Sequence, residues 1–410
     1  MTNDFFGTFS LLFLCLPGYL FSRLLLGNSR LVENLALSFP IGIQIFTLSV
    51  FVFNFVFGVQ LTQVTGWALG LSLTLLLLLV NTAKKSQKVI LTFKPTYLFA
   101  AILIVVLLLF FSALISSHWF PITDWDAVTL YDFRAKVILR TGWISDTLFR
   151  ARFTDYPLLT TLGHWWMRVN GSFTPLPIYQ MFLWSFVLVV FSALNKNFSK
   201  RTSLLATLFI VLCPKLFEQS FVAYSNLPYT IYLIIGLIYF NIWFSERNSE
   251  NLSMALTLTL MSFWARTFPF AAGSILAMLY VFKPTRKLFY VIATGGLIYF
   301  LINTWPFNIQ IFWSSLDFLK WSILGYYFPY PLMFVLIAVY QFKNKIKNNY
   351  LLVSTTIFWL LIILGNYYYA LSDPNYSSIP DAAQRTTMFI NPAIALLLIS
   401  VLHEKETALS

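Results

Sequence analysis

The stretch ITDWDAVTLYDFRAKVILRTGW, residues 122–143, is followed by FTDYPLL, residues 153–159, and both lie between long hydrophobic runs. Although the chain has only 15 acidic residues in 410, five lie in this region: Asp124, Asp126, Asp132, Asp146 and Asp155. Ionisable groups beside hydrocarbon are costly and are usually retained for a function. The cluster therefore indicates a site rather than a linker.

The composition around this stretch is that of a polytopic membrane protein. Hydrophobic residues make up 59% of the chain and charged residues 10%, and the mean hydropathy is +0.75, far from the balance of a soluble domain. The net charge of +12 comes mostly from short basic tracts between apolar runs, so we expect membrane lipid as a partner and no nucleic acid. Cys15 and Cys213 are too few for a disulfide framework or a zinc site.

The apolar runs are long enough for membrane-spanning helices and too long for barrel strands, which predicts an all-α polytopic bundle of about 12–13 spans. The run at 252–282 contains Arg266 and Pro269, so we expect two helices separated by a break. We place the spans near residues 5–22, 35–58, 62–81, 97–116, 177–195, 202–217, 226–244, 252–282, 288–305, 326–342, 350–370 and 386–402.

We expect one integral membrane domain over residues 1–410. Residues 1–94 form a three-span N-terminal extension in this prediction, and residues 95–410 form a core that carries the acidic loop 117–156. The positive-inside rule places the basic tracts in the cytoplasm. Alternation of the spans then puts the acidic loop on the exterior face of the inner (plasma) membrane.

Segment 156–171, YPLLTTLGHWWMRVNG, is apolar but short. If it crossed the membrane, the next basic tract would move outside. We therefore expect an interfacial or re-entrant helix with Trp165, Trp166 and Arg168 at the level of the lipid headgroups.

Segment 127–140 is typical of an amphipathic surface helix. Val128, Val137 and Ile138 can face lipid in this arrangement. Asp132 precedes Lys136 by four residues, which is the spacing of a helical ion pair.

The two acids of the WDA element have two interpretations each. A carboxylate at the outer membrane surface can accept a proton from an incoming hydroxyl, which makes Asp126 a candidate base. An Asp before a helix also caps it, and residue type alone favours the cap. One of Asp124 and Asp126 can cap while the other reacts.

Asp155 precedes Tyr156 and Pro157, and the same two interpretations apply to it. Together with Asp126 it would form a carboxylate pair across one loop, which can orient a nucleophile or bind a divalent metal. No His-x-x-x-His element and no carboxylates at fixed helical spacing accompany the pair. The sequence therefore assigns no metal ligands and no cofactor, and a divalent metal stays open.

Cationic side chains on the same predicted face can clamp a phosphate, as Arg does bidentately and Lys as a point charge. The candidates are Arg134, Lys136, Arg150 and Arg152, with Arg266 and Arg385 near span ends. Their alternative role is snorkelling to lipid headgroups, which residue type favours for most of them. Arg266 differs because it lies inside the apolar stretch SFWARTFPF and needs a partner or a water-filled cavity.

Other catalytic patterns are missing from the sequence. His118 and His164 have no Ser or Cys elbow and no orienting third residue, so a hydrolase triad has no support, and we interpret both as interfacial. No GxxxxGK[ST] element and no strand-linked GxGxxG element is present, which argues against ATP-driven transport.

The order of elements resembles the C-type (GT-C) membrane glycosyltransferases, in particular the protein-mannosyltransferase-like and aminoarabinose-transferase-like enzymes (glycosyltransferase family 39-like). In those families an Asp soon after a span is followed by an amphipathic helix, a Gly-Trp-like turn and a Tyr-Pro-Pro-Leu-like element. The resemblance covers roughly residues 97–200. The matching positions here are Asp126, Gly142, Trp143, Tyr156, Pro157 and Leu158.

The resemblance implies a hexosyl or pentosyl transferase that moves a sugar from a polyprenyl-phosphate donor to a glycan, lipid or protein acceptor at the exterior face, with inversion at the anomeric carbon. Asp126 would be the catalytic base, and Asp155 would be a second loop acid. Arg134, Lys136 and Arg385 would be candidates for the lipid-phosphate site. Tyr156 and Arg266 are further candidates for binding the lipid phosphate or the sugar.

Three features depart from the family pattern. The acidic loop follows the fourth predicted span, whereas it normally follows the first in these families. The Tyr-Pro-Pro-Leu-like element has one Pro, and Asn226 stands before a Leu-Pro pair where related sequences often have Asp. Two other functions remain as alternatives. A polysaccharide polymerase or ligase also uses lipid-linked donors but usually carries its large loop late in the chain, and a transporter or flippase would be expected to show inverted repeats.

Overall fold

The computed structural model describes residues 2–27, 30–82, 111, 114–115, 117–148, 156–196, 198–213, 215–317, 320, 328–343, 349–372 and 380–409. Regular secondary structure in these ranges is helical, with no strand, which confirms the predicted all-α class. The chain divides into two units. The first comprises residues 1–208, 217–235 and 248–267, and the second comprises residues 209–216, 236–247 and 268–410.

The first unit contains the N-terminal helices and the acidic loop, and two of its helices, α9 and α10, continue into the second unit. In chain order the elements are α1 (Thr2–Leu26), α2 (Leu31–Phe51), the π-helical η1 (Val52–Val56), α3 (Gln63–Thr82), the π-helical η2 (Ala127–Asp132), α5 (Phe133–Thr141), α6 (Ser145–Leu148), α7 (Leu159–Val169), α8 (Leu176–Leu194), α9 (Lys200–Val211), the 3-10 helix η3 (Glu218–Phe221), α10 (Asn226–Glu246) and α11 (Ser249–Ala265).

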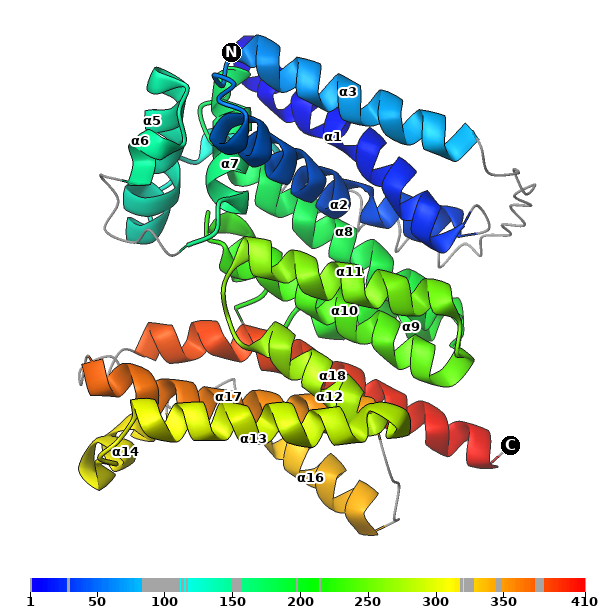
Figure 1. Cartoon of the computed structure of the whole chain (residues 1–410). Helices are drawn as coiled ribbons and strands as arrows, with labels where there is room; N and C mark the ends of the chain where they lie inside the picture. Colours follow the sequence, from blue (N-terminus) through cyan, green and yellow to red (C-terminus); the bar gives the residue numbers. More distant parts are fainter. Residues whose placement is uncertain are drawn as a thin grey trace. The chain divides into compact units, whose positions relative to one another are not determined.

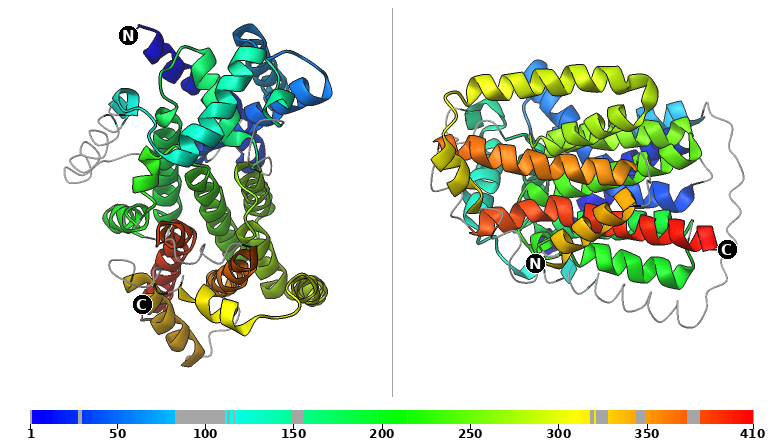
Figure 2. Two further views of the ribbon diagram at one scale, coloured as in Figure 1. Left: turned by 90° about the vertical axis from the view of Figure 1, so that its left-hand side faces the viewer. Right: turned by 90° about the horizontal axis from the view of Figure 1, so that it is seen from below.

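The second unit contains the C-terminal helices. They are α12 (Phe270–Val281), the 3-10 helix η4 (Lys283–Thr285), α13 (Arg286–Asn303), α14 (Ile309–Ser315), α16 (Pro329–Lys343), α17 (Tyr350–Ser372) and α18 (Pro380–Leu409). α17 and α18 lie alongside each other in Figure 2 and pack together. The ring of Phe270 at the start of α12 contacts Phe358 of α17 and Phe389 of α18, with centroids 5.3 and 5.2 Å away.

Eight helices in the described ranges are long and apolar enough to cross a membrane, so the chain is an integral, multi-pass membrane protein. The eight segments are Phe6–Leu26, Leu31–Val56, Gln63–Thr82, Leu176–Leu194, Asn226–Glu246, Lys283–Asn303, Tyr350–Leu371 and Arg385–Leu402. The predicted span at 97–116 lies almost wholly outside the described residues. α9 and α16 have 12 and 15 residues, short of a full span, so the predicted total of twelve to thirteen stays a prediction.

The predicted break in the run 252–282 is confirmed. α11 ends at Ala265, and Arg266 is extended with φ −162° and ψ 143°. α12 begins at Phe270, after Pro269. Because Pro lacks an N–H and disfavours a helical residue before it, the chain leaves the helix where a cation interrupts the apolar sequence.

α1 and α2 pack with their backbones in contact, and α3 lies against α1 (Figure 1). A Cβ atom added to Gly18 would lie 1.8 Å from the Ser38 carbonyl oxygen, and one added to Gly42 would lie 1.8 Å from the Leu14 carbonyl oxygen. Small residues permit such approach, which gains dispersion energy where lipid provides no hydrophobic driving force. The predicted N-terminal three-span segment therefore packs within the first unit, and the boundary near residue 94 stays a prediction.

α7 is a buried helix of 11 residues between α5 and α2 (Figure 1). Its length is too short for a span. Trp165 and Trp166 are fully buried within the protein, and their predicted position at headgroup level stays a prediction. Trp166 packs on Phe46 of α2 with ring centroids 4.7 Å apart. Gly66 of α3 leaves room for the Trp166 ring, which lies 2.8 Å from the position of an added Cβ.

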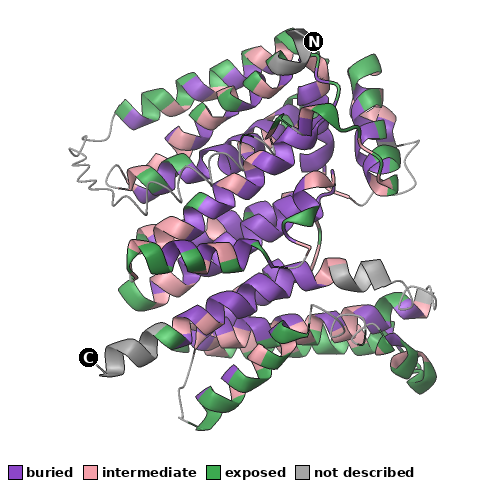
Figure 3. Cartoon of the chain, turned by 180° about the vertical axis from the view of Figure 1, so that it is seen from behind, coloured by how far each residue is buried: buried purple, intermediate pink, exposed green. Residues whose placement is uncertain are grey.

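The predicted helix at 127–140 is present as η2 and α5. Val128 is exposed as expected, but Ile138 is fully buried, so its predicted lipid-facing position is wrong. α5 packs on α7, and Ala135 and Ile138 of α5 are fully buried. By contrast, α13 has no buried residue, whereas α18, the helix that ends at the C label in Figure 3, is coloured mostly as buried.

Candidate functional site

The helix of the acidic loop begins directly after Asp124, at Trp125. Asp126 therefore lies inside the helical run, in front of η2, with φ −63° and ψ −34°, and its side chain accepts no capping hydrogen bond there. Asp124 holds the position that precedes the run, and which of the two acids caps stays a prediction. The run ends at Gly142, which adopts φ +77° and donates its N–H to the Ile138 carbonyl oxygen at 2.7 Å.

Arg266 is surrounded by polar partners from distant parts of the first unit. One terminal nitrogen donates to the Asn226 side-chain oxygen and to Ser225 Oγ, the latter at 3.4 Å. The other donates to the Tyr156 hydroxyl at 3.5 Å, and the guanidinium carbon lies 5.1 Å from the centre of the Tyr156 ring. Arg266, which lies in an apolar stretch of the sequence, thus has hydrogen-bond partners just after the end of α11.

Tyr131 extends this cluster toward the acidic loop. Its hydroxyl is 2.7 Å from Ser225 Oγ, and its ring meets the Tyr156 ring edge to face with centroids 6.0 Å apart. Burial raises the pKa of Tyr131, the positive charge of Arg266 opposes that rise, and the negative charge of Asp126 adds to it. Arg266 and Asp126 therefore both lie within electrostatic reach of one buried hydroxyl.

Arg134 is buried under the same cluster, with 1% of its surface exposed. One terminal nitrogen donates to the Tyr156 carbonyl oxygen at 3.3 Å, and Nε has no hydrogen-bond partner among the described residues. Burial lowers the pKa of the Arg134 guanidinium, because removing a cation from water disfavours its charged form. Arg134 thus fixes the backbone of Tyr156 while keeping part of its donor capacity unused.

A groove of about 660 Å³ opens beside Tyr156 in the first unit. Its walls come from α2, α11 and the Tyr156–Pro157 segment: Gln44, Leu48, Tyr156, Pro157, Thr257, Leu260, Met261, Phe263, Trp264 and Thr267. Most of these side chains are apolar. Gln44 is 1% exposed, and its Oε1 has no hydrogen-bond partner among the described residues. The groove can therefore hold an apolar chain, with one buried polar group in its wall and Arg266 next to Tyr156 at its edge.

The Asp132 carboxylate joins the acidic loop to α7. Arg168 donates to both carboxylate oxygens, at 2.9 and 2.8 Å, and the predicted helical pair with Lys136 is confirmed at 2.8 Å. Burial raises the pKa of Asp132, but the interaction with His164 and the hydrogen bonds from Arg168 and Lys136 outweigh the effect of burial, so the pKa is lowered. Arg168 is therefore bound to a protein carboxylate. The sequence-based prediction, which placed Arg168 at headgroup level, did not include this ion pair.

His164 is fully buried beside Asp132, and its predicted place at the membrane interface stays a prediction. Its Nε2 is 2.7 Å from the Tyr179 hydroxyl, and its Nδ1 is 3.8 Å from Asp132. Burial lowers the pKa of His164 to about 4, although Asp132 pulls in the opposite direction. The ring is consequently neutral at pH 7. His118 differs, because it is only partly buried and lies 2.7 Å from Thr8 Oγ1 of α1.

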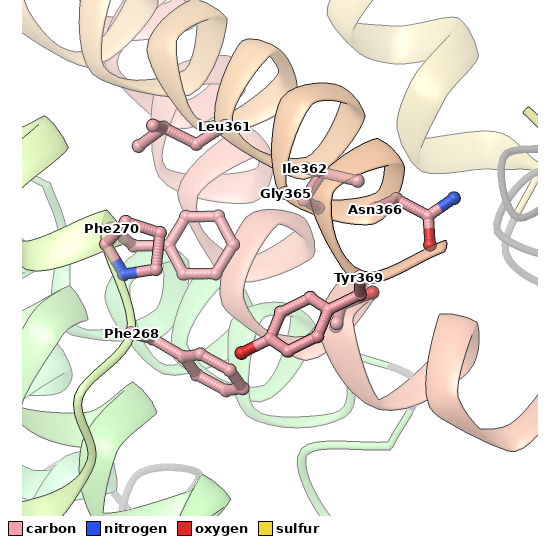
Figure 4. Close-up of a pocket in the computed structure, with 9 residues that line it drawn as sticks. Phe268, Phe270, Leu361, Ile362, Gly365, Asn366 and Tyr369 are labelled. Atoms are coloured by element: carbon pink, nitrogen blue, oxygen red, sulfur yellow. The ribbon is translucent and has the colours of Figure 1, made fainter. Parts of the chain in front are cut away.

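Two predicted site residues remain. Asp155 lies outside the described residues, although its neighbour Tyr156 lines the groove. The candidate cations Arg150 and Arg152 also lie outside the described residues. Arg385 belongs to α18 in the second unit, where the next residue, Thr386, lines a small pocket of about 70 Å³. Figure 4 shows Phe268, Phe270 and Tyr369 around this pocket with Asn366 at its side. Asn366 is nearly buried and donates to the Ser315 carbonyl oxygen.

The described residues contain no group of three or more His, Cys, Asp or Glu side chains close enough to hold a metal ion. Asp132 differs in role from Asp126, since its carboxylate is bound by the two cations Arg168 and Lys136. The divalent metal that the sequence left open would need Asp155, which is not among these residues.

Sequence reasoning missed several members of the Arg266 cluster. Ser225 and Asn226 lie 41 and 40 residues before Arg266, and no local pattern connects them. Asn226 was visible only as a departure from the family pattern. Tyr131 of the cluster and Gln44 of the groove wall belong to largely apolar segments, so the sequence did not single them out. The structure distinguishes them because each is a buried side chain that carries a polar atom.

No known protein family, curated protein or solved structure matches this chain.

Proposed function

We propose that this chain is a membrane glycosyltransferase that moves a sugar from a polyprenyl-phosphate donor to an acceptor hydroxyl at the exterior membrane face. The observation that carries the proposal is the Arg266 and Tyr156 pair at the edge of a largely apolar groove. Tyr131, which contacts Tyr156, is within electrostatic reach of both Arg266 and Asp126. A polyprenyl-phosphate has the same two parts, an apolar chain and an anionic group.

In this proposal the groove holds isoprenoid units nearest the phosphate, and Arg266 faces the phosphate. The Tyr156 ring and the Asn226 side chain orient the guanidinium, so its position does not depend on the ligand. A fixed cation stabilises charge that develops on the departing phosphate without reorganising during the reaction. Arg134 supports Tyr156 from beneath through the backbone contact.

The reaction is a single displacement. The acceptor oxygen forms a bond to the anomeric carbon while the bond from that carbon to the phosphate oxygen breaks. The Asp126 carboxylate takes the acceptor proton, and the electron pair of the broken bond leaves with the polyprenyl phosphate. Inversion at the anomeric carbon follows because one bond forms opposite the one that breaks.

The test replaces Asp126 by Asn in the full-length protein and measures sugar transfer from a polyprenyl-phosphate-linked donor in reconstituted membranes. Loss of a positioned base lowers a rate typically by 10²–10⁴-fold, and we expect a loss in that range. Asp146→Asn is the matched control, since it removes a carboxylate from α6 of the same loop. Transfer by Asp126→Asn at the wild-type rate would refute the assignment of the base.

The same groove chemistry would also serve a flippase for lipid-linked glycans. The two functions separate when the reconstituted vesicles are assayed for both reactions. Movement of the donor lipid between leaflets with no sugar transfer to any acceptor would replace the transferase proposal by the transport one. Transfer that disappears in Asp126→Asn while the control retains it would support the transferase.

A further inference from the structure

The C-terminal end of α10 carries a second pocket, entirely within the second unit and separate from the groove beside Tyr156. It encloses about 430 Å³ and is lined by Phe244, Arg247, Val281, Phe282, Lys283 and Pro284. This volume is in the range of pockets that hold small ligands. The walls combine apolar rings with two cations.

Arg247 occupies a backbone conformation that favours glycine. Its φ is +56°, and its N–H donates to the Trp243 carbonyl oxygen at 2.8 Å, which ends the helix. Gly is the usual residue at such a position, because a side chain is strained there. A long cationic side chain at a strained turn next to a pocket indicates a role for the side chain itself.

The guanidinium of Arg247 is held by aromatic rings. Its central carbon lies 5.1 Å from the Trp243 and Phe244 ring centres and 5.6 Å from the Phe282 ring centre. Among the described residues, Arg247 makes no ion pair and no side-chain hydrogen bond. Stacking against rings uses the faces of a guanidinium, so its N–H groups remain available as donors.

Further cations follow the pocket along the chain. Lys283 and Lys287 are exposed, and Arg286 donates Nε to the Tyr280 carbonyl oxygen at 2.9 Å while stacking on its ring at 5.0 Å. Glu246 is the acidic neighbour in sequence and is exposed. The site therefore carries a net positive charge, because one acidic side chain lies near four cationic ones: Arg247, Lys283, Arg286 and Lys287.

We propose that this pocket binds the phosphate of an anionic phospholipid headgroup. The pocket lies where the membrane-spanning α10 ends and the apolar α12 passes into η4, the level at which aromatic side chains meet headgroups. Basic pockets between helices at this level bind anionic headgroups. The phosphate faces Arg247 and Lys283, and the first carbons of the lipid contact Phe244 and Phe282. This site is independent of the proposed sugar transfer.

The experiment measures binding of phosphatidylglycerol and phosphatidylcholine to the full-length protein in detergent by native mass spectrometry. Arg247→Gly is the main variant, since Gly accepts the positive φ and the helix end is preserved. Lys283→Gln is the second variant. Lys343→Gln is the matched control, because it removes one exposed cation from the end of α16.

One Lys or Arg beside an anionic lipid headgroup raises the binding affinity roughly five-fold. We therefore expect each of the two variants to bind phosphatidylglycerol about five-fold more weakly, with phosphatidylcholine binding and the Lys343→Gln control unchanged. We also expect Arg247→Gly to unfold at the wild-type temperature or above it. That result separates loss of the ligand from loss of the fold.

Wild-type binding of phosphatidylglycerol by both variants would overturn the proposal. Equal weakening for both lipids would also overturn it, because the pocket would then only contact the lipid annulus. The last measurement adds inorganic phosphate as a competitor of phosphatidylglycerol. If it displaced phosphatidylglycerol at equal concentration, the pocket would be a site for soluble phosphate and not for a lipid.

Discussion

Replacing Asp132 by Asn tests whether the acidic loop is held to α7 by a buried charge. The carboxylate is 2% exposed and accepts hydrogen bonds from Arg168 at 2.9 and 2.8 Å and from Lys136 at 2.8 Å. The side chains of Arg168 and Lys136 are 15% and 50% exposed. Arg168 is therefore the principal partner, and the contribution of Lys136 is screened by solvent.

The expected magnitude follows from this geometry. Removing one partner of a buried pair typically costs about 3–5 kcal/mol, because the other charge remains without compensation. An exposed helical pair such as that with Lys136 contributes about 0.3–0.5 kcal/mol. We therefore expect Asp132→Asn to lower the free energy of unfolding by about 3 kcal/mol, and Lys136→Gln by less than about 1 kcal/mol.

The assay is equilibrium unfolding in mixed detergent micelles at pH 7, followed by tryptophan fluorescence. Asp146→Asn provides the control, with an expected change within about 0.5 kcal/mol. The Asp132→Asn and Arg168→Gln double variant should be less destabilised than the sum of the single variants, since the two residues share one interaction. A loss below about 1 kcal/mol for Asp132→Asn, or strict additivity, would refute the reasoning.

Two further predictions concern pH and helix packing. The pKa of His164 falls from 6.5 in the unfolded chain to about 4 in the folded protein, because the side chain is buried. Between these two pH values the unfolded chain therefore binds a proton at His164 that the folded protein does not bind. Folding stability should be complete above pH 6.5 and fall by up to about 3 kcal/mol as the pH drops to 4, at about 1.36 kcal/mol per pKa unit. In His164→Phe this dependence should be absent from unfolding curves measured between pH 7 and 4.5, and an unchanged slope would contradict it. Gly42→Val should separate α1 from α2, because its Cβ would meet the Leu14 carbonyl oxygen at 1.8 Å. We expect a loss of several kcal/mol in the same unfolding assay, with the exposed Gly296→Ala as control and equal stability as the contrary result.

Local features of the chain were predictable because they depend on neighbours in sequence. The break between α11 and α12 followed from Arg266 and Pro269 within an apolar run, and both are confirmed outside helices. The helix over 127–140 and the pair of Asp132 with Lys136 followed from helical spacing. Composition alone indicated an integral membrane protein, because water cannot solvate so much apolar surface.

The tertiary structure decided which polar groups meet. Arg168 lies 36 residues from Asp132, and Arg266 lies 40 residues from Asn226. Such partners depend on how α5, α7, α10 and α11 dock, which no periodicity encodes. The same holds for Trp165 and Trp166, which packing against α2 and α3 buries. An apolar side chain gains similarly from lipid and from protein, so hydrophobicity in the sequence places a residue in the membrane, and only complementary shape selects its neighbours.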